Sequence, residues 1–380
     1  MTGFFRTHIT IGIAFLSACA VHAQTAIPAA PELAARGYLL LDHNSGAVLA
    51  AQNEHERLDP ASITKLMTAY VTFRAIKSGQ IALDDDVLIS EKAWRTAGSR
   101  MFIEVDTRVS AKKLLQGMII QSGNDASVAL AEHLAGTEEA FTQLMNQYAL
   151  ELGMRDTRYR NSTGLPAEDH YTSASDIARL ARTIISEFPE YYRWYSQKEF
   201  TYNDISQNNR NALLWRDPSV DGMKTGMTDA AGYCLVSSAE RDGMRLVAVV
   251  LGTESSSART RDSLALLNYG FRFYETRLVY KAGGSVAEAR VWKGDAENTD
   301  VGLKDDLYVT IPRGSFKKLR AQIELSSQII APVTPRTPMG TVRINLDQET
   351  VAEANLFALV TINEGTIWQV AKDSLLLWFE

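Results

Sequence analysis

DPASITK, residues 59–65, is the segment around which the rest of the chain is organised. Asp59 is a favourable helix N-cap and Pro60 suits the first helical position, so a helix is predicted to begin here. Residues three apart share a helix face, which brings the Ser62 hydroxyl within hydrogen-bond reach of the Lys65 amine. A helix start also supplies unpaired backbone N–H groups and a partial positive charge, which suit an oxyanion. The segment therefore predicts a serine nucleophile beside a lysine base.

The predicted base, Lys65, can take the serine proton only in its neutral form. Burial among apolar residues and nearby cations both lower the pKa of a lysine, and both would prepare Lys65 for this task. An ordinary capped helix with a solvated lysine is the alternative. Because Ser-x-x-Lys occurs by chance about once or twice in a chain of this length, other motifs must decide between the two.

Two short motifs further along the chain fit the same chemistry. SGN at residues 122–124 follows a helical stripe of apolar residues within 111–121, and KTG occupies residues 224–226. A KTG triplet is expected by chance in roughly one such chain in ten. Ser-x-x-Lys, a Ser-x-Asn element and Lys-Thr-Gly occur together in penicillin-binding proteins and class A β-lactamases. The three motifs in this order predict an active-site serine enzyme.

The chain resembles the low-molecular-mass penicillin-binding proteins, the serine D-alanyl-D-alanine carboxypeptidases of bacterial cell-wall maturation. The resemblance implies a transpeptidase-like α/β domain, in which an antiparallel sheet is flanked by helices and a helical lobe, followed by a small all-β domain. The similarity covers nearly the whole chain after the leader. Besides the three motifs it rests on YLLLD (38–42), NSG (44–46), QSGNDA (121–126), NRN (209–211), LLW (213–215), VDG (220–222) and YGFRFYE (269–275).

The resemblance implies hydrolysis of the last D-Ala-D-Ala bond of peptidoglycan stem peptides, and acylation by β-lactam antibiotics. Ser62 would attack the carbonyl after Lys65 takes its proton, D-alanine would leave, and water would release the acyl-enzyme. Ser122 and Lys224 would relay a proton to the leaving amine. We expect no metal and no organic cofactor.

The resemblance also predicts how the peptide is held. A carboxypeptidase must recognise a free carboxylate, and a planar guanidinium is a usual means. Arg259 matches the family's carboxylate-binding arginine, and Arg261 in the same serine-rich turn is a rival claimant. The backbone N–H groups of Ser62 and Met227 would form the oxyanion hole. The predicted substrate-binding residues are Asn124, Thr225, Gly226, Met227, Arg259 and Arg210.

Two positions depart from the best-known members of this family. Met227 follows KTG where a histidine is frequent, and Thr163 in STGL (162–165) also stands in place of a histidine. The first change replaces only a side chain, so the backbone N–H of residue 227 is still available as a hydrogen-bond donor. The two changes leave open the rate of deacylation and its pH dependence, which the resemblance alone does not predict for this chain.

Two rival functions remain open at this stage. A class A β-lactamase adds a glutamate that activates the deacylating water, and Glu168 in PAEDH (166–170) matches that element poorly. A catalytically weak scaffold that binds peptidoglycan is the rival from another class. The intact motif residues argue against it.

Length and composition agree with an exported two-domain protein. The chain has 380 residues, 46% of them hydrophobic and 22% charged, and a net charge of −6 that argues against a nucleic-acid partner. Arg6 and His8 precede an apolar run that ends in small residues, which predicts a signal peptide cleaved after Ala23. A lipoprotein-type sequence that would lipidate Cys19 is the alternative. Cys234, within a predicted core strand, is then a lone and inert thiol.

The predicted order of parts is a signal peptide at 1–23, a catalytic domain at 24–275, a β domain at 276–362 and a terminal helix at 363–380. Short alternating strands are expected at 286–292, 307–311, 320–325 and 341–345. The segment 365–380 is too short to span a bilayer, but its apolar residues share one helical face. We expect it to anchor the protein peripherally on the periplasmic face of the inner membrane. Packing of this helix on the β domain is the alternative.

Overall fold

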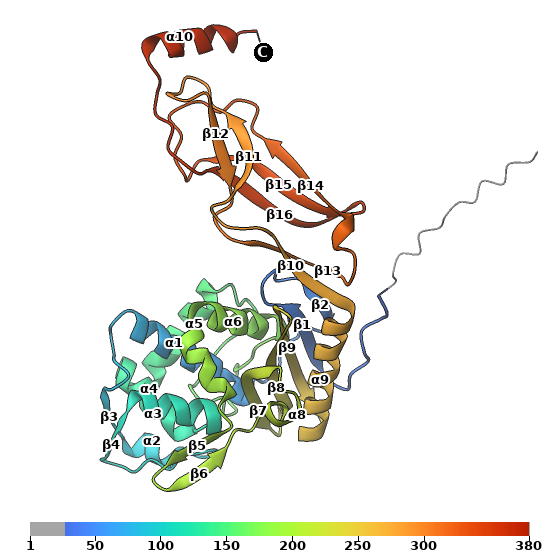
Figure 1. The fold of residues 1–380 in the computed structure, drawn as a ribbon. Coiled ribbons are helices and arrows are strands. Elements are labelled where there is room, and N and C mark those ends of the chain that lie inside the picture. Colours follow the sequence, from blue (N-terminus) through green and yellow to red (C-terminus); the bar gives the residue numbers. More distant parts are fainter. Residues whose placement is uncertain (1–26, 380) are drawn as a thin grey trace, which may run out of the picture.

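The computed structural model describes residues 27–379, which form two β-sheet bodies and a terminal helix (Figure 1). The larger body is built on a five-stranded antiparallel sheet with the order β2-β1-β9-β8-β7. This confirms the predicted fold class, and KTG lies on β7, an edge strand of the sheet. The strands are β1 (Gly37–Asp42), β2 (Val48–Gln52), β7 (Val220–Thr228), β8 (Gly232–Arg241) and β9 (Met244–Thr253).

Both faces of this sheet are buried, because successive side chains of a strand point to opposite sides. Leu39 and Leu41 of β1 belong to the core beneath the helical lobe, whereas Leu40 packs in the core beneath α9 (Ser256–Phe273). Figure 1 shows α9 along one side of the sheet and the lobe on the other. The sheet therefore holds β7 rigidly at the edge that faces the lobe.

The helical lobe lies between β2 and β7 in the sequence. Helix ends in the lobe follow ordinary local signals: Ser173 caps α6 through its Oγ, and α5 is followed by Gly153 with a φ of +72°. The helices are α1 (Lys65–Lys77), α2 (Glu91–Arg95), α3 (Ala111–Gln116), α4 (Asn124–Ala135), α5 (Glu138–Glu151), α6 (Ala174–Glu187), α7 (Pro189–Tyr192) and α8 (Leu213–Arg216). Two hairpins complete the lobe, β3 (Asp86–Leu88) with β4 (Arg108–Ser110) and β5 (Glu199–Tyr202) with β6 (Ile205–Asn208).

The helix predicted to begin at residues 59–60 starts differently from the prediction. Asp59 does not cap it; a 3₁₀ turn, η1 (Ala61–Thr64), comes first and α1 begins at Lys65. Ala61 has a left-handed backbone conformation, with a φ of +46°, and the backbone of Gly164 packs against it. A Cβ on Gly164 would lie 1.7 Å from the Ala61 carbonyl oxygen. Tertiary packing therefore overrides the local capping signal.

The second body, residues 274–364, is all β and has its own hydrophobic core. Three of its strands, β10, β12 and β16, were not predicted. A ribbon of β10 and β13 leads to a sheet with the order β11-β12-β16-β15-β14. The strands are β10 (Tyr274–Tyr280), β11 (Ser285–Arg290), β12 (Asn298–Gly302), β13 (Leu307–Pro312), β14 (Leu319–Leu325), β15 (Pro338–Leu346) and β16 (Glu349–Ala358).

The chain ends in α10 (Ile367–Leu376), which Figure 1 shows at the far end of the β body from the lobe. The side chains of Trp368 and Leu375 in this helix are exposed, and so are those of Trp378 and Phe379, which follow it. Across residues 27–379, no helix combines the length and the apolar character needed to cross a membrane.

Candidate active site

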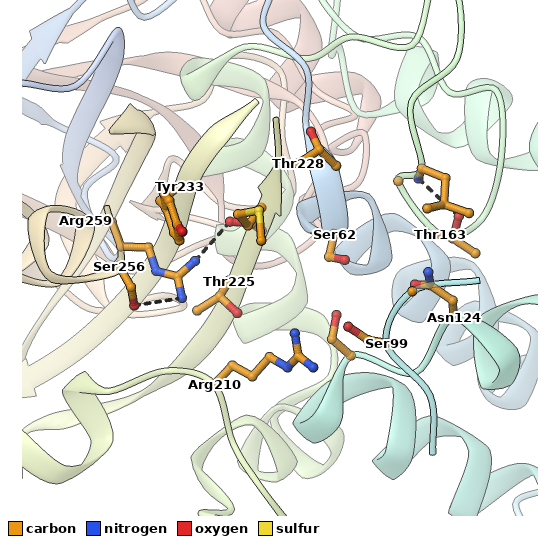
Figure 2. Close-up of a pocket in the computed structure, with 16 residues that line it drawn as sticks. Ser62, Ser99, Asn124, Thr163, Arg210, Thr225, Thr228, Tyr233, Ser256 and Arg259 are labelled. Atoms are coloured by element: carbon orange, nitrogen blue, oxygen red, sulfur yellow. Dashed lines mark hydrogen bonds between the residues drawn. The ribbon is translucent and has the colours of Figure 1, made fainter. Parts of the chain in front are cut away.

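The predicted site residues converge on one cleft of about 430 Å³ between the edge strand β7, the η1 turn and the lobe (Figure 2). Lys65 and Lys224 lie just behind its wall, each bonded to a serine that opens into it. The other predicted residues line the cleft: Ser62, Ser122, Asn124, Arg210, Thr225, Gly226, Met227 and Arg259.

Lys65 lies where a general base for Ser62 must lie. Its Nζ is 2.9 Å from Ser62 Oγ, 2.7 Å from Asn124 Oδ1 and 2.6 Å from the Thr163 carbonyl oxygen. A neutral amine has two hydrogens and one lone pair. The two hydrogens match the amide and carbonyl acceptors, which leaves the lone pair for the serine proton.

The electrostatics of the site favour neutral Lys65. The side chain is 1% exposed, and burial lowers its pKa to about 7, with a further lowering from the charge of Arg210. Asp125 acts in the opposite direction. Near pH 7, a substantial fraction of Lys65 is therefore the free base, as the sequence predicted.

Ser122 and Lys224 form a second pair, which joins the SGN loop of the lobe to strand β7. Lys224 Nζ donates to Ser122 Oγ and to the Thr225 carbonyl oxygen, each at 2.9 Å. The pKa of Lys224 lies well below its usual value. Burial is the main cause, and the charges of nearby cations, including Lys65, lower the pKa further. Ser122 follows a π-helical turn, η2 (Gly117–Gln121), and has a φ of +70° that turns the SGN loop toward the cleft.

Asp125, which sequence reasoning did not single out, organises the side of the cleft that carries the SGN loop. Its buried carboxylate accepts hydrogen bonds from the backbone N–H groups of Met101 and Phe102, both at 3.0 Å. Asn124 Nδ2 meanwhile donates to the Ala97 carbonyl oxygen at 2.6 Å. Together they fix the loop that brings Ser99 into the cleft. An aspartate directly after SGN was the available sequence signal.

Arg259 lies at the end of the cleft formed by β7 and α9 (Figure 2). Its Nη1 donates to the Gly226 carbonyl oxygen at 3.0 Å, and its guanidinium lies over Tyr233, 5.5 Å from the ring centre. Burial lowers the pKa of Arg259. Arg261 instead lies at the surface and pairs with Asp262 at 3.0 Å. Tyr233 and Ser256, which also line this end, were not predicted.

Thr163 and Met227, which differ from the best-known members of the family, have different surroundings. The Thr163 hydroxyl donates to Asn161 Oδ1 at 3.0 Å, so only its backbone carbonyl meets Lys65. Met227 is 52% exposed at the rim of the cleft. Neither a threonine hydroxyl nor a thioether titrates near neutral pH, so neither side chain can exchange a proton there as a histidine does.

Two further predictions concern residues that carry no catalysis here. Cys234 is fully buried in β8, as predicted, and burial raises the pKa of its thiol to about 11, which disfavours the reactive thiolate. Glu168 is exposed and does not line the cleft. In the part of the chain that the structure describes, no group of three His, Cys, Asp or Glu side chains could hold a metal ion.

Comparisons with known proteins agree with this geometry. Residues 24–255 match a family model described as D-alanyl-D-alanine carboxypeptidase, and residues 274–364 match the C-terminal domain of penicillin-binding protein 5. The chain is 42% identical over 377 residues to D-alanyl-D-alanine carboxypeptidase DacA of Escherichia coli (strain K12), covering 96% of this chain and 94% of that protein.

Solved structures give the same result. The crystal structure of penicillin-binding protein 5 from Haemophilus influenzae superposes with a TM-score of 0.85 at 41% identity, covering 89% of this chain and all of that one. Penicillin-binding protein D2 of Listeria monocytogenes, solved in its ampicillin-bound form, has a TM-score of 0.60 at 28% identity and covers 64% of this chain and all of its own.

Proposed function

The chain belongs to the serine D-alanyl-D-alanine carboxypeptidases, and on that premise we propose how its cleft removes the last D-alanine of a peptidoglycan stem peptide. One observation carries the proposal. Lys65 is buried, its pKa is lowered to about 7, and its three contacts leave its lone pair facing Ser62 Oγ.

In the proposed acylation, neutral Lys65 takes the Ser62 proton while Oγ attacks the carbonyl carbon of the penultimate D-alanine. The backbone N–H groups of Ser62 and Met227 stabilise the oxyanion. The C–N bond then breaks, and Ser122, held by Lys224 at 2.9 Å, relays a proton to the leaving amine. Attack of water on the ester releases the shortened peptide and restores Ser62. A β-lactam ring would acylate Ser62 by the same route.

A single experiment separates this function from its two rivals. Intact-protein mass spectrometry after addition of penicillin is expected to show a lasting adduct on Ser62, because the exposed Glu168 is too remote to activate a deacylating water. Rapid loss of the adduct would indicate a β-lactamase. A protein that forms no adduct would fit the scaffold instead.

We expect Arg259→Ala to lower carboxypeptidase efficiency about 10- to 100-fold, since a charge-assisted contact to the substrate carboxylate is lost. The Thr225 hydroxyl would bind the same carboxylate, and Arg210 would add positive charge near it. Kinetics of D-alanine release measure the effect. The matched control is Arg261→Ala, which removes an exposed guanidinium two residues away and should leave the rate unchanged.

Because Arg259 also supports the backbone of β7, a second substrate isolates its charge. The wild type should lose most of its rate when the terminal carboxylate is replaced by an amide. Arg259→Ala should be almost indifferent to the same replacement. If both proteins discriminate equally, the carboxylate is bound by another residue.

The proposed division of the chain is a signal peptide at 1–23, a catalytic domain at 24–275, a β domain at 276–362 and an anchor at 363–380. The predicted cleavage site after Ala23 and the alternative lipidation site Cys19 lie outside the described residues. Export to the periplasm agrees with the cell-wall substrate. The β domain would then act as a spacer between the cleft and the inner membrane.

The surroundings of α10 support peripheral attachment to that membrane. Two polar contacts join it to the β body: the Lys293 backbone N–H donates to Asp373 at 2.6 Å, and Lys372 pairs with Glu297 at 3.1 Å. Trp368 and Trp378 are 85% and 84% exposed. The apolar residues of the terminal helix are therefore available to an interface, and tryptophan favours the headgroup region of a bilayer.

Deletion of residues 365–380 is expected to convert a membrane-associated protein into a soluble periplasmic one. Because the cleft lies in the other body, activity on small peptides should be undiminished. Fractionation of cells and a peptide assay measure the two properties. If the truncated protein still sediments with membranes, the anchor lies elsewhere, and a lipidated Cys19 becomes the better explanation.

A further inference from the structure

A second cavity of about 370 Å³ adjoins the catalytic cleft. Thr163 and Leu165 line both of them. The second cavity is also lined by Lys92 and Arg95 of α2 and by Glu138 at the start of α5. Neither the reaction nor the binding of D-Ala-D-Ala uses these charged residues.

The direction of the bound peptide leads toward this cavity. Figure 2 shows Arg259, Ser256 and Tyr233 on one side of Ser62, and Asn124 and Thr163 on the other. If the terminal carboxylate lies at Arg259, as proposed above, the acyl part of the substrate leaves Ser62 on the Thr163 side.

The distances allow the substrate to reach the two shared residues. The Lys65 amine contacts both Ser62 Oγ, at 2.9 Å, and the Thr163 carbonyl oxygen, at 2.6 Å. An extended peptide advances about 3.3–3.6 Å per residue. The residue before the penultimate D-alanine would therefore lie beside Thr163 and Leu165, and its side chain would enter the second cavity.

The negative charge within the cavity is already neutralised. Lys92 Nζ pairs with Glu138 at 3.1 Å and with Glu139 at 3.0 Å. The other carboxylate oxygen of Glu138 accepts hydrogen bonds from the backbone N–H of Ser162 at 3.0 Å and from its hydroxyl at 2.7 Å. Glu138 therefore has little capacity left for a cationic ligand.

Arg95 is the cation that a ligand can recruit. Its ion-pair partner is Glu91, one helical turn away, and the two side chains are 69% and 66% exposed. Exposed pairs of this type contribute little, so the guanidinium can turn to another carboxylate at small cost. A guanidinium also matches the planar geometry of a carboxylate.

We propose that this cavity binds the side chain of the stem-peptide residue before D-Ala-D-Ala, and that Arg95 selects a side chain ending in a free carboxylate. This inference rests on the proposed function. Arg95 contacts none of the reacting atoms and acts as a specificity residue for the known reaction. The selection should appear as a difference between substrates rather than as a loss of all activity.

The test uses two peptides that differ only at the end of that side chain, which is a carboxylate in one and a carboxamide in the other. We expect kcat/KM for D-alanine release by the wild type to be about tenfold higher on the carboxylate peptide. Arg95→Gln should react equally with both, at the wild-type rate for the carboxamide. Arg155→Gln, which removes an exposed guanidinium elsewhere in the lobe, should keep the full preference.

Each outcome is decisive for one of the two proposals. Equal rates on both peptides with the wild type, or an undiminished preference in Arg95→Gln, would overturn the cavity assignment while D-alanine release continues. No release from either peptide would instead overturn the proposed function. The rate of penicillin labelling at Ser62 should be unchanged in Arg95→Gln, which shows that the variant is folded.

Discussion

Replacement of Ser62 by alanine is expected to abolish covalent labelling by a fluorescent penicillin and to lower turnover on the order of a millionfold. Ser62 Oγ is the atom that Lys65 prepares, at 2.9 Å, and the adduct has no bond without it. The fold should survive, because the η1 turn is held by backbone packing from Gly164 and Gly226 rather than by this side chain. Gel fluorescence and thermal unfolding measure the two properties.

The matched control for this variant is Ser99→Ala, which removes another hydroxyl from the same cleft. It should still be labelled, since Ser99 has no lysine within hydrogen-bond distance among its described contacts. Labelling of Ser62→Ala would move the nucleophile to a different residue.

Lys65→Arg is expected to have the next largest effect, a loss of about 10²- to 10⁴-fold in acylation rate. A guanidinium cannot be deprotonated at working pH, so the variant has no lone pair for the Ser62 proton. The larger head group must also fit where the amine now contacts Asn124 and Thr163. Stopped-flow acylation measures the loss, and Lys77→Arg at the exposed end of α1 is the matched control.

The pH profile tests the same base in the wild type. Burial lowers the pKa of Lys65 to about 7, and the reactive form is the neutral one. The acylation rate should therefore rise as the pH increases through about 7 and then level off. In Lys65→Arg the low residual rate should lack this rise. Wild-type acylation by Lys65→Arg would remove lysine as the base.

Local spacing made part of the site predictable. Ser62 and Lys65 are three residues apart, and their contact survives although a 3₁₀ turn replaces the expected capped helix. Nothing local brings residues 122–124 and 224–226 to the same cleft. The order of strands in the sheet does this by placing β7 at the edge, and only resemblance to a known family anticipated it.

The features that were missed depend on contacts distant in sequence. The left-handed backbone at Ala61 and Ser122 is imposed by neighbouring loops, and neither residue type signals it. Strand β16 reads ETVAEANLFA, in which Glu and Ala are weak strand formers, yet it pairs with β15 along its length. Tyr233 and Ser256 enter the cleft only because α9 packs on β8.

The central claim is that Ser62 and Lys65 together remove the terminal D-alanine of a stem peptide. It is tested most directly by D-alanine release from a pentapeptide ending in D-Ala-D-Ala, measured for the purified wild type and Ser62→Ala side by side. The wild type should release one D-alanine per peptide and stop at the tetrapeptide, and Ser62→Ala should release none. Absence of D-alanine from the wild-type reaction, or equal release by both proteins, would contradict the account.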